Sequence, residues 1–166
     1  MPGAPLTVDD LLAREEIGDV IKRLARGTDR LDEALMASCY HPDGFDDHNS
    51  FRGSGAEFAR WVVTVLPHFT ATMHFLGMPL IRRDGDTAQV DTYCVAHHLT
   101  DATDMILGLR YVDRFERRDG TWLIGRRVCA FDWTYTVAID PTTRWPFGDD
   151  FVVGARDAGD ITYRGV

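Results

Sequence analysis

The sequence predicts an α+β fold in which three N-terminal helices pack on a long, curved antiparallel sheet. Apolar residues recur at helical spacing over the first part of the chain, and four long strand-like segments joined by tight turns follow. Because helices and strands are segregated along the chain, the helices are expected on one side of the sheet. The 166 residues suit one domain over residues 1–166, with an irregular C-terminal tail over 136–166, where prolines and glycines accumulate.

The first helix is expected to begin after Thr7, which offers an N-cap and precedes carboxylates that suit the positive end of the helix dipole. Apolar spacing extends it over residues 11–31, either as one helix or as two helices separated at Gly27. A second amphipathic helix is expected over 31–40, because Pro42 cannot continue it.

The third helix follows a turn-rich segment. Residues 41–49 are rich in Pro, Asp, Gly and Asn, which predicts a turn and then a short extended piece around Phe45. The third helix is capped by Ser54 or Gly55 and carries an apolar stripe up to Pro67. These stripes are expected to face the sheet.

Four strands are predicted after the third helix, over residues 72–81, 87–99, 107–117 and 121–135. Asp-Gly pairs lie in the turns that join the first two and the last two strands, and such pairs tolerate the positive φ angles of tight hairpins. The strand over 87–99 is unusually long, so we expect a bend or bulge in it. A sheet of this length must twist, and a sheet that curls over helices forms a cone with a pocket at its mouth.

Composition argues against several classes of function. The formal net charge is -8 and no basic block occurs, which disfavours nucleic acid and anionic membranes as partners. No apolar run approaches the roughly 20 residues that a membrane span needs. The three cysteines are widely spaced and form no C-x-x-C pattern, which disfavours disulfides and zinc and suits a reducing cytoplasm. The sequence also lacks the glycine-rich phosphate loop, G-x-S-x-G and H-E-x-x-H, so neither a cofactor nor a metal is expected.

Six short motifs carry a family resemblance. They are DRLD (29–32), CYHPD (39–43), DDH (46–48), TMHFLG (72–77), RYVDRFE (110–116) and WLI (122–124). Their order and spacing over residues 10 to about 135 resemble the SnoaL-like branch of the nuclear-transport-factor-2-like superfamily. That branch includes scytalone dehydratase, a hexachlorocyclohexane dehydrochlorinase and a bile-acid dehydratase. The resemblance implies the cone-shaped, cystatin-like fold and a cofactor-independent lyase or isomerase.

The resemblance also implies a catalytic pair. The enzymes of this branch share a buried Asp–His dyad that removes a proton during elimination, and Asp29 and His74 match it. An imidazole suits such a base because its ordinary pKa is about 6.5, and a carboxylate on its other nitrogen fixes the tautomer. The alternative roles are a core histidine bonded to backbone and a carboxylate that caps a turn. One departure is Thr28, where scytalone dehydratase has a tyrosine.

Two pairs of adjacent residues offer one further site residue each, because neighbours on a strand point to opposite faces. His97 is favoured over His98 by counting from the family's second polar strand position, and it would protonate the leaving group as an acid. Arg127 is favoured over Arg126 and would hold a substrate carboxylate or enolate oxygen. The alternatives are an exposed histidine near the strand end and an outward arginine.

The remaining candidates for substrate binding are aromatic or polar residues of the predicted strands and loops: Tyr40, His48, Tyr93, Tyr111, Phe131 and Trp133. Most aromatic residues are expected in the core, with a minority lining a wall for a flat or polycyclic ligand. His48 lies beside two aspartates, but adjacent residues seldom chelate one ion, so a pocket or loop position is expected.

The expected function is therefore a dehydratase-like lyase or isomerase acting on a small hydrophobic molecule through Asp–His general base catalysis. Two alternatives stay open: a binding or assembly module of the same fold, and an enzyme like a polyketide cyclase or epoxide hydrolase. An antiparallel sheet with an exposed face also predicts a homo-oligomer. Because the resembling dehydratases are trimers, a trimer is favoured over a dimer.

Overall fold

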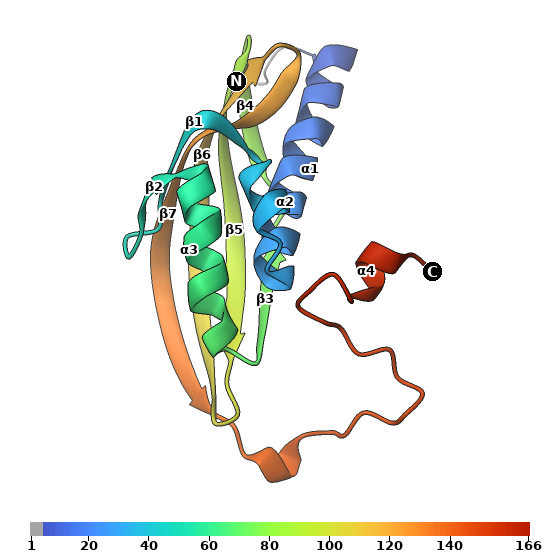
Figure 1. The fold of residues 1–166 in the computed structure, drawn as a ribbon. Coiled ribbons are helices and arrows are strands. Elements are labelled where there is room, and N and C mark those ends of the chain that lie inside the picture. The colour runs from blue at the N-terminus through green and yellow to red at the C-terminus, as the bar shows by residue number, and fades with distance from the viewer. Residues whose placement is uncertain (1–4) are drawn as a thin grey trace.

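The computed structural model describes residues 5–166, and in it three helices cover one face of a curved seven-stranded sheet (Figure 1). The helices are α1 (Val8–Arg30), α2 (Glu33–Ala37) and α3 (Gly55–Val65). The predicted fold class, α+β with three helices on a long curved sheet, is confirmed. Within these residues no helix combines the length and the apolar character that a membrane crossing demands.

The first helix is a single helix that continues through Gly27. Thr7 and Asp10 form a capping box at its start, and Leu31 ends it in the left-handed conformation with φ 56°. A Cβ added at Gly27 would lie 2.8 Å from Cγ of Met36, so this glycine lets α2 pack closely against α1. The glycine therefore serves packing and does not interrupt the helix.

The second helix is shorter than predicted, because the chain turns into a strand at Tyr40. Asp32 caps α2 by accepting from the backbone N–H of Leu35 at 2.9 Å. The third helix starts at Gly55, so of the two predicted caps it is Ser54 that caps it, in a capping box with Glu57.

The sheet contains seven strands in the order β2-β1-β7-β6-β5-β3, with β4 paired to β5 beyond one end of β3. They are β1 (Tyr40–Asp47), β2 (Arg52–Ser54), β3 (Ala71–Leu76), β4 (Leu80–Asp84), β5 (Thr87–Leu99), β6 (Thr103–Arg118) and β7 (Thr121–Ala138). The predicted strand over 72–81 is thus two strands. All pairs are antiparallel except β1 with β7, which is parallel.

The two predicted Asp-Gly turns are present, with positive φ at Gly85, Asp119 and Gly120. A bend or bulge was predicted in the strand over 87–99, which is β5, but β5 pairs with β6 in unbroken register. It is β7 that shifts twice against β6. These shifts leave one extra residue each in β7, at Gly125 and at Asp132. A bulge bends the strand and reverses the side-chain alternation beyond it, which matters for the site.

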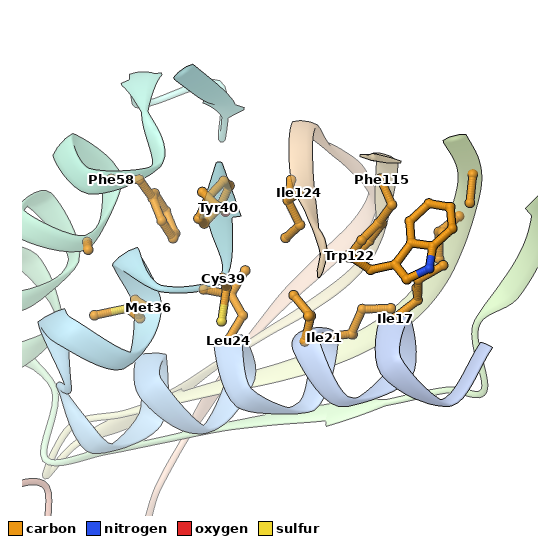
Figure 2. Close-up of a cluster of buried hydrophobic side chains, with 14 of the residues drawn as sticks. Ile17, Ile21, Leu24, Met36, Cys39, Tyr40, Phe58, Phe115, Trp122 and Ile124 are labelled. Carbon is orange, nitrogen blue, oxygen red and sulfur yellow. The ribbon is translucent and has the colours of Figure 1, made fainter. Parts of the chain in front are cut away.

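The main hydrophobic core lies between α1 and one end of the sheet (Figure 2). Ile17 and Leu24 of α1 pack with Phe115, Trp122 and Ile124 of β6 and β7, and all five side chains are fully buried. A second, smaller cluster lies further along β5, β6 and β7 and includes Cys94, Leu109, Tyr111 and Cys129. The main core closes one end of the cone, and the second cluster forms the floor of its other end.

The C-terminal tail begins after Ala138, because β7 extends three residues into the segment predicted as tail. Beyond it the chain holds only two short helices, at Pro141–Thr143 and Ile161–Arg164, and returns to the end of α1 (Figure 1). Arg30 and Asp160 anchor this return with an ion pair of 3.0 Å. Arg156 donates to the carbonyl oxygens of Leu66 and Phe69 and thereby fastens the tail near α3.

Candidate active site

The sequence-predicted pair, Asp29 and His74, is in direct contact. Asp29 lies in the last turn of α1, and His74 projects from β3, which packs against that helix. His74 Nδ1 lies 2.7 Å from Asp29 Oδ1, and the His74 backbone N–H donates to Oδ2 at 2.9 Å. Thr72 Oγ1 donates to Oδ1 at 2.9 Å. The carboxylate is therefore held by three groups of one strand.

The surroundings of Asp29 favour its ionised form. Burial disfavours the charge, but the hydrogen bonds from the His74 ring, the His74 backbone and Thr72 outweigh it and hold the pKa of Asp29 below its ordinary value. An ionised carboxylate only accepts, so His74 Nδ1 carries a proton toward it. Within residues 5–166 the other ring nitrogen, Nε2, has no hydrogen-bond partner.

A cavity of about 350 Å³ opens beside this pair, between α3 and the inner face of β5, β6 and β7. Most of its lining side chains are apolar or aromatic, among them Phe58, Trp61, Phe69, Leu109 and Phe131. Among the described residues, no Lys, Arg, Asp or Glu side chain lines it. Phe58 and Trp61 come from the apolar stripe of α3, and both were among the aromatic residues expected mostly in the core, with a minority lining a ligand wall.

His98 lines this cavity, and the sequence preference for His97 is thereby corrected. On β5 the buried residues have even numbers, so His98 faces the helices together with Ala96, while His97 faces outward. His97 Nδ1 instead bonds Asp104 Oδ2 at 2.7 Å. The family-based count selected the wrong face of the strand.

His98 connects the cavity to the Asp–His pair. Its ring meets the His74 ring edge-on, with 5.5 Å between the centroids, and its Nδ1 is buried without a partner among the described residues. His74 itself is not among the cavity's lining side chains. Burial, and then the neighbouring His74, lower the pKa of His98 to about 4, so this ring is neutral at pH 7.

The lowered pKa of His98 predicts a loss of stability in mild acid. The unfolded chain binds a proton near pH 6.5 and the native chain only near its pKa of about 4, so stability falls as pH drops through this window. Between about pH 7 and about pH 4.5 we expect a loss of roughly 2 to 3 kcal/mol from this residue. Urea unfolding at both pH values should show a smaller loss for His98→Gln than for the wild type. Equal losses in the two proteins would contradict this origin.

Arg127 points inward as preferred, but it is not available to a substrate. Its guanidinium binds both oxygens of Asp113 at 2.7 Å, and both side chains are buried. It also lies 4.0 Å from the ring centroid of Tyr111, behind the cavity wall. Arg126 is exposed and covers Phe45 on the outer face. The predicted contact of Arg127 with a substrate oxygen is therefore corrected to a structural ion pair.

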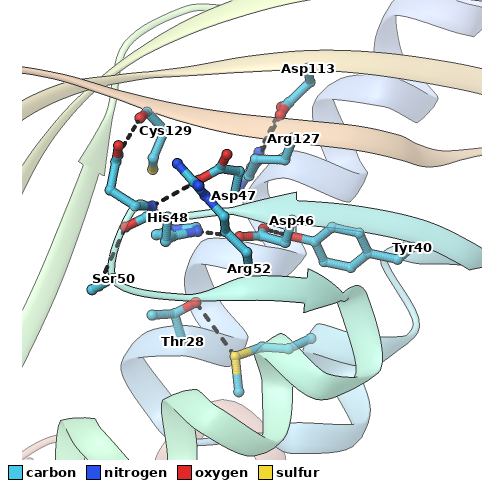
Figure 3. A network of polar contacts seen from close by, with 12 residues as sticks. Thr28, Tyr40, Asp46, Asp47, His48, Ser50, Arg52, Asp113, Arg127 and Cys129 are labelled. Atoms are coloured by element: carbon cyan, nitrogen blue, oxygen red, sulfur yellow. Dashed lines mark hydrogen bonds and ion pairs between the residues drawn. The ribbon is translucent and has the colours of Figure 1, made fainter.

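His48 lines the cavity, and its ring contacts the carboxylate of Asp46 (Figure 3). Its Nδ1 bonds Asp46, and the other oxygen of that carboxylate accepts from the Tyr40 hydroxyl at 2.5 Å. Tyr40 itself is buried in the main core and does not line the cavity. Sequence reasoning missed Asp46. The available signal was the D-x-H spacing, which places both side chains on one face of an extended strand.

The other aromatic candidates divide between the two faces of the sheet. Tyr111 and Phe131 line the cavity, whereas Tyr93 and Trp133 lie on the outer face in a shallow depression around Gly108. Phe131 and Trp133 would share a face in a regular strand, but the extra residue Asp132 between them reverses the alternation. Tyr93 and Trp133 are thus corrected from cavity wall to outer surface.

Known proteins share this fold. A candidate scytalone dehydratase from Novosphingobium aromaticivorans has a TM-score of 0.69 at 20% identity, covering 85% of this chain and 100% of its own. A hexachlorocyclohexane dehydrochlorinase from Novosphingobium barchaimii has a TM-score of 0.72 at 20% identity, covering 78% and 93%. An uncharacterised protein of Mycobacterium tuberculosis is 28% identical over 130 residues, 74% of this chain and 88% of that protein. The model of the SnoaL-like domain matches residues 9–128, and the chain therefore belongs to the SnoaL-like family.

Proposed function

We propose that the protein is a cofactor-independent, dehydratase-like lyase or isomerase that uses Asp29 and His74 as a general base pair. The observation that carries the proposal is the 2.7 Å contact between the His74 ring and the Asp29 carboxylate, next to an apolar cavity. The two solved structures with named activities point to the same chemistry, since dehydration and dehydrochlorination are both eliminations. The similarity to these two structures supports the fold of the chain, and the contact between His74 and Asp29 supports the proposed elimination.

In the proposed reaction His74 Nε2 accepts a proton from a carbon atom next to a carbonyl or ring system. Asp29 holds the ring through Nδ1 and stabilises the imidazolium as it forms. Because His98 lines the cavity and its ring contacts His74, we place the acidic C–H of the substrate beside His98. A neutral His98 does not repel the positive charge that develops on His74.

The cavity wall favours an uncharged, hydrophobic substrate. No Lys or Arg side chain of the described residues lines the cavity, so a carboxylate or phosphate would find no permanent positive charge there. The rings of Phe58, Trp61 and Phe131 suit a flat or cyclic molecule. We therefore expect small cyclic compounds, aromatic or polycyclic ones included, that carry a leaving group one carbon from an acidic C–H.

The test is exchange of carbon-bound hydrogen with solvent deuterium. Neutral cyclic β-hydroxy ketones, from 3-hydroxycyclohexanone to larger fused rings, are incubated with the protein in D₂O and followed by mass spectrometry and NMR. We expect time-dependent deuterium uptake and loss of water with the wild type, and neither above background with His74→Gln. Compounds that bind in the cavity without exchange or elimination would contradict an enzymatic role.

One observation favours a second candidate, a binding module: His74 is absent from the cavity lining and meets it only through His98. The same experiment separates the two, because a binding module retains affinity without deuterium uptake. No carboxylate lines the cavity among the described residues. The several carboxylates that a cyclase or epoxide hydrolase of this fold would need around a water are thus not gathered there.

We also propose that the chain acts as one domain in the cytoplasm and self-associates, as a trimer in preference to a dimer. The anchored tail supports one domain, and three unpaired cysteines suit a reducing compartment. The outer sheet face exposes apolar side chains, Phe75, Tyr93 and Tyr135 among them, that a second copy would cover. Light scattering should give three times the 18.7 kDa of one chain, and a monomer at working concentration would contradict self-association.

A further inference from the structure

We propose that His48, oriented by Asp46, is the acid that protonates the leaving oxygen of the substrate, which makes that substrate a neutral cyclic alcohol. This inference rests on the proposed function and deepens it. The Asp29–His74 pair accounts for removal of a proton, but hydroxide is a poor leaving group and needs a proton as the C–O bond breaks. His48 and Asp46 form a second pair that this proton removal does not use.

The second pair is built on the end of β1. Asp46 is fully buried and sits opposite Arg127 of β7 in the parallel register. Its two carboxylate oxygens accept from the Tyr40 hydroxyl and bond the His48 ring (Figure 3). The backbone N–H of His48 donates to the carbonyl of Phe51 at 2.9 Å and fixes the turn that follows. Side chain and backbone of His48 are thus both held in place.

The ring of His48 faces the cavity. It stacks on Phe58 with 4.4 Å between the centroids and lines the wall next to Tyr111. Its Nδ1 is occupied by Asp46, and Nε2 has no hydrogen-bond partner among residues 5–166. An imidazole with a carboxylate on one nitrogen and a ligand cavity at the other is the geometry of an acid or base catalyst.

Asp46 is the acidic residue in contact with the His48 ring. The other titratable groups around it are Tyr40 of β1, Tyr111 and Asp113 of β6, and Arg127 and Cys129 of β7. Burial raises the pKa of the two phenols and of the thiol, so all three stay neutral at pH 7. The guanidinium is occupied by Asp113 in a two-bond ion pair. Asp46 is therefore the acidic residue that bonds His48 directly, at Nδ1.

His48 and His98 line different walls of one cavity. His48 belongs to β1 and His98, which meets His74, belongs to β5, with β7 and β6 between these strands in the sheet. An elimination needs a base at the C–H and an acid at the leaving group, one carbon further along. In the proposed complex the neighbouring C–H and C–O groups of the substrate both lie between these two walls.

His74 Nε2 takes the proton from the carbon next to the carbonyl, and the C–H electron pair forms an enolate, which can take a deuteron back at carbon. The enolate electrons then form the new C=C bond as the C–O bond breaks with its electrons going to oxygen. The oxygen takes the proton from His48 Nε2 and leaves as water. His48 ends neutral and His74 protonated; once water and product have left, His74 releases its proton to solvent and His48 takes one up from solvent.

The experiment compares two rates on the same compounds, deuterium uptake at carbon and formation of the unsaturated ketone, for the cyclic β-hydroxy ketones named above. We expect His48→Gln to lower the ratio of elimination to uptake by about 10²-fold or more, since general acid catalysis contributes 10² to 10⁴. With 3-chlorocyclohexanone and larger chloro ketones, whose chloride leaves without a proton, the loss should be at least tenfold smaller. Asp46→Asn should lower the same ratio in the same direction.

The matched control is His97→Gln, which breaks a His–Asp contact of similar length on the outer face of the sheet. It should leave both rates as in the wild type, and urea midpoints identify any variant that has lost its fold. An unchanged ratio in folded His48→Gln and Asp46→Asn would overturn this inference and leave the base pair standing. A wild type that shows no deuterium uptake on any compound would instead overturn the proposed function, and this inference with it.

Discussion

Replacing Arg127 with methionine is expected to destabilise the protein by about 3 to 5 kcal/mol, the usual cost of removing one partner from a buried ion pair. Asp113 is almost completely buried and both its oxygens accept from this guanidinium. Burial raises the pKa of Asp113. Without Arg127 the carboxyl must therefore lie unpaired in the interior or take up a proton. Urea unfolding at pH 7 measures the loss directly.

Two further variants make this prediction specific. Arg126→Met removes the neighbouring arginine, which is exposed, and should change the free energy of unfolding by less than about 0.5 kcal/mol. The double variant Arg127→Met with Asp113→Leu should recover part of the loss, because it leaves no uncompensated charge in the core. If Arg127→Met and Arg126→Met unfold at the same urea concentration, the ion pair does not stabilise the fold.

The ion pair also supports the site, which is why its position matters for function. Arg127 lies against the ring of Tyr111, and Tyr111 lines the cavity next to His48. Asp113 pairs with Arg127, while the Asp46 carboxylate bonds Tyr40 and His48. Arg127, which was preferred from the sequence as a substrate contact, thus supports the cavity-lining residue Tyr111 and does not line the cavity itself.

Local signals in the sequence predicted the elements of the fold well. The capping residues Thr7 and Ser54 mark two helix starts, and the Asp-Gly turns mark two hairpins, because each is decided by a few neighbouring residues. At Gly27 the sequence left open a break between two helices. The structure shows one helix, and a glycine is needed there because a side chain would collide with Met36 of the next helix. Tertiary contacts of this kind cannot be read from spacing.

The faces of the strands were harder to predict than the strands themselves. Alternation predicts that His97 and His98 diverge, but which one faces inward depends on how β5 docks on the helices. The bulge at Asp132 places Phe131 and Trp133 on opposite faces of the sheet, and no glycine or proline next to Asp132 indicates this bulge in the sequence. The Asp46–His48 pair was missed because its place depends on the parallel pairing of β1 with β7, two strands about 80 residues apart.

The Asp29–His74 pair could be predicted only through the family resemblance, because 45 residues separate its members and no local pattern links them. Its replacement is expected to have the largest effect on catalysis. Asp29→Asn should lower kcat/KM for water elimination and deuterium uptake by about 10² to 10⁴. The amide can present its N–H₂ group to His74 Nδ1, which favours the tautomer with the proton on Nε2 and leaves no lone pair for the substrate.

Combining the changes tests whether the two residues act as one unit. His74→Gln and the double variant with Asp29→Asn should be about equally slow, because residues that work together lose their effect together. Thr72→Val is the matched control: it removes one hydrogen bond to Asp29 but keeps both contacts from His74, so kcat/KM should fall by less than about tenfold. If Asp29→Asn is folded and as fast as Thr72→Val, the carboxylate does not orient the base, and the 2.7 Å contact only joins α1 to β3.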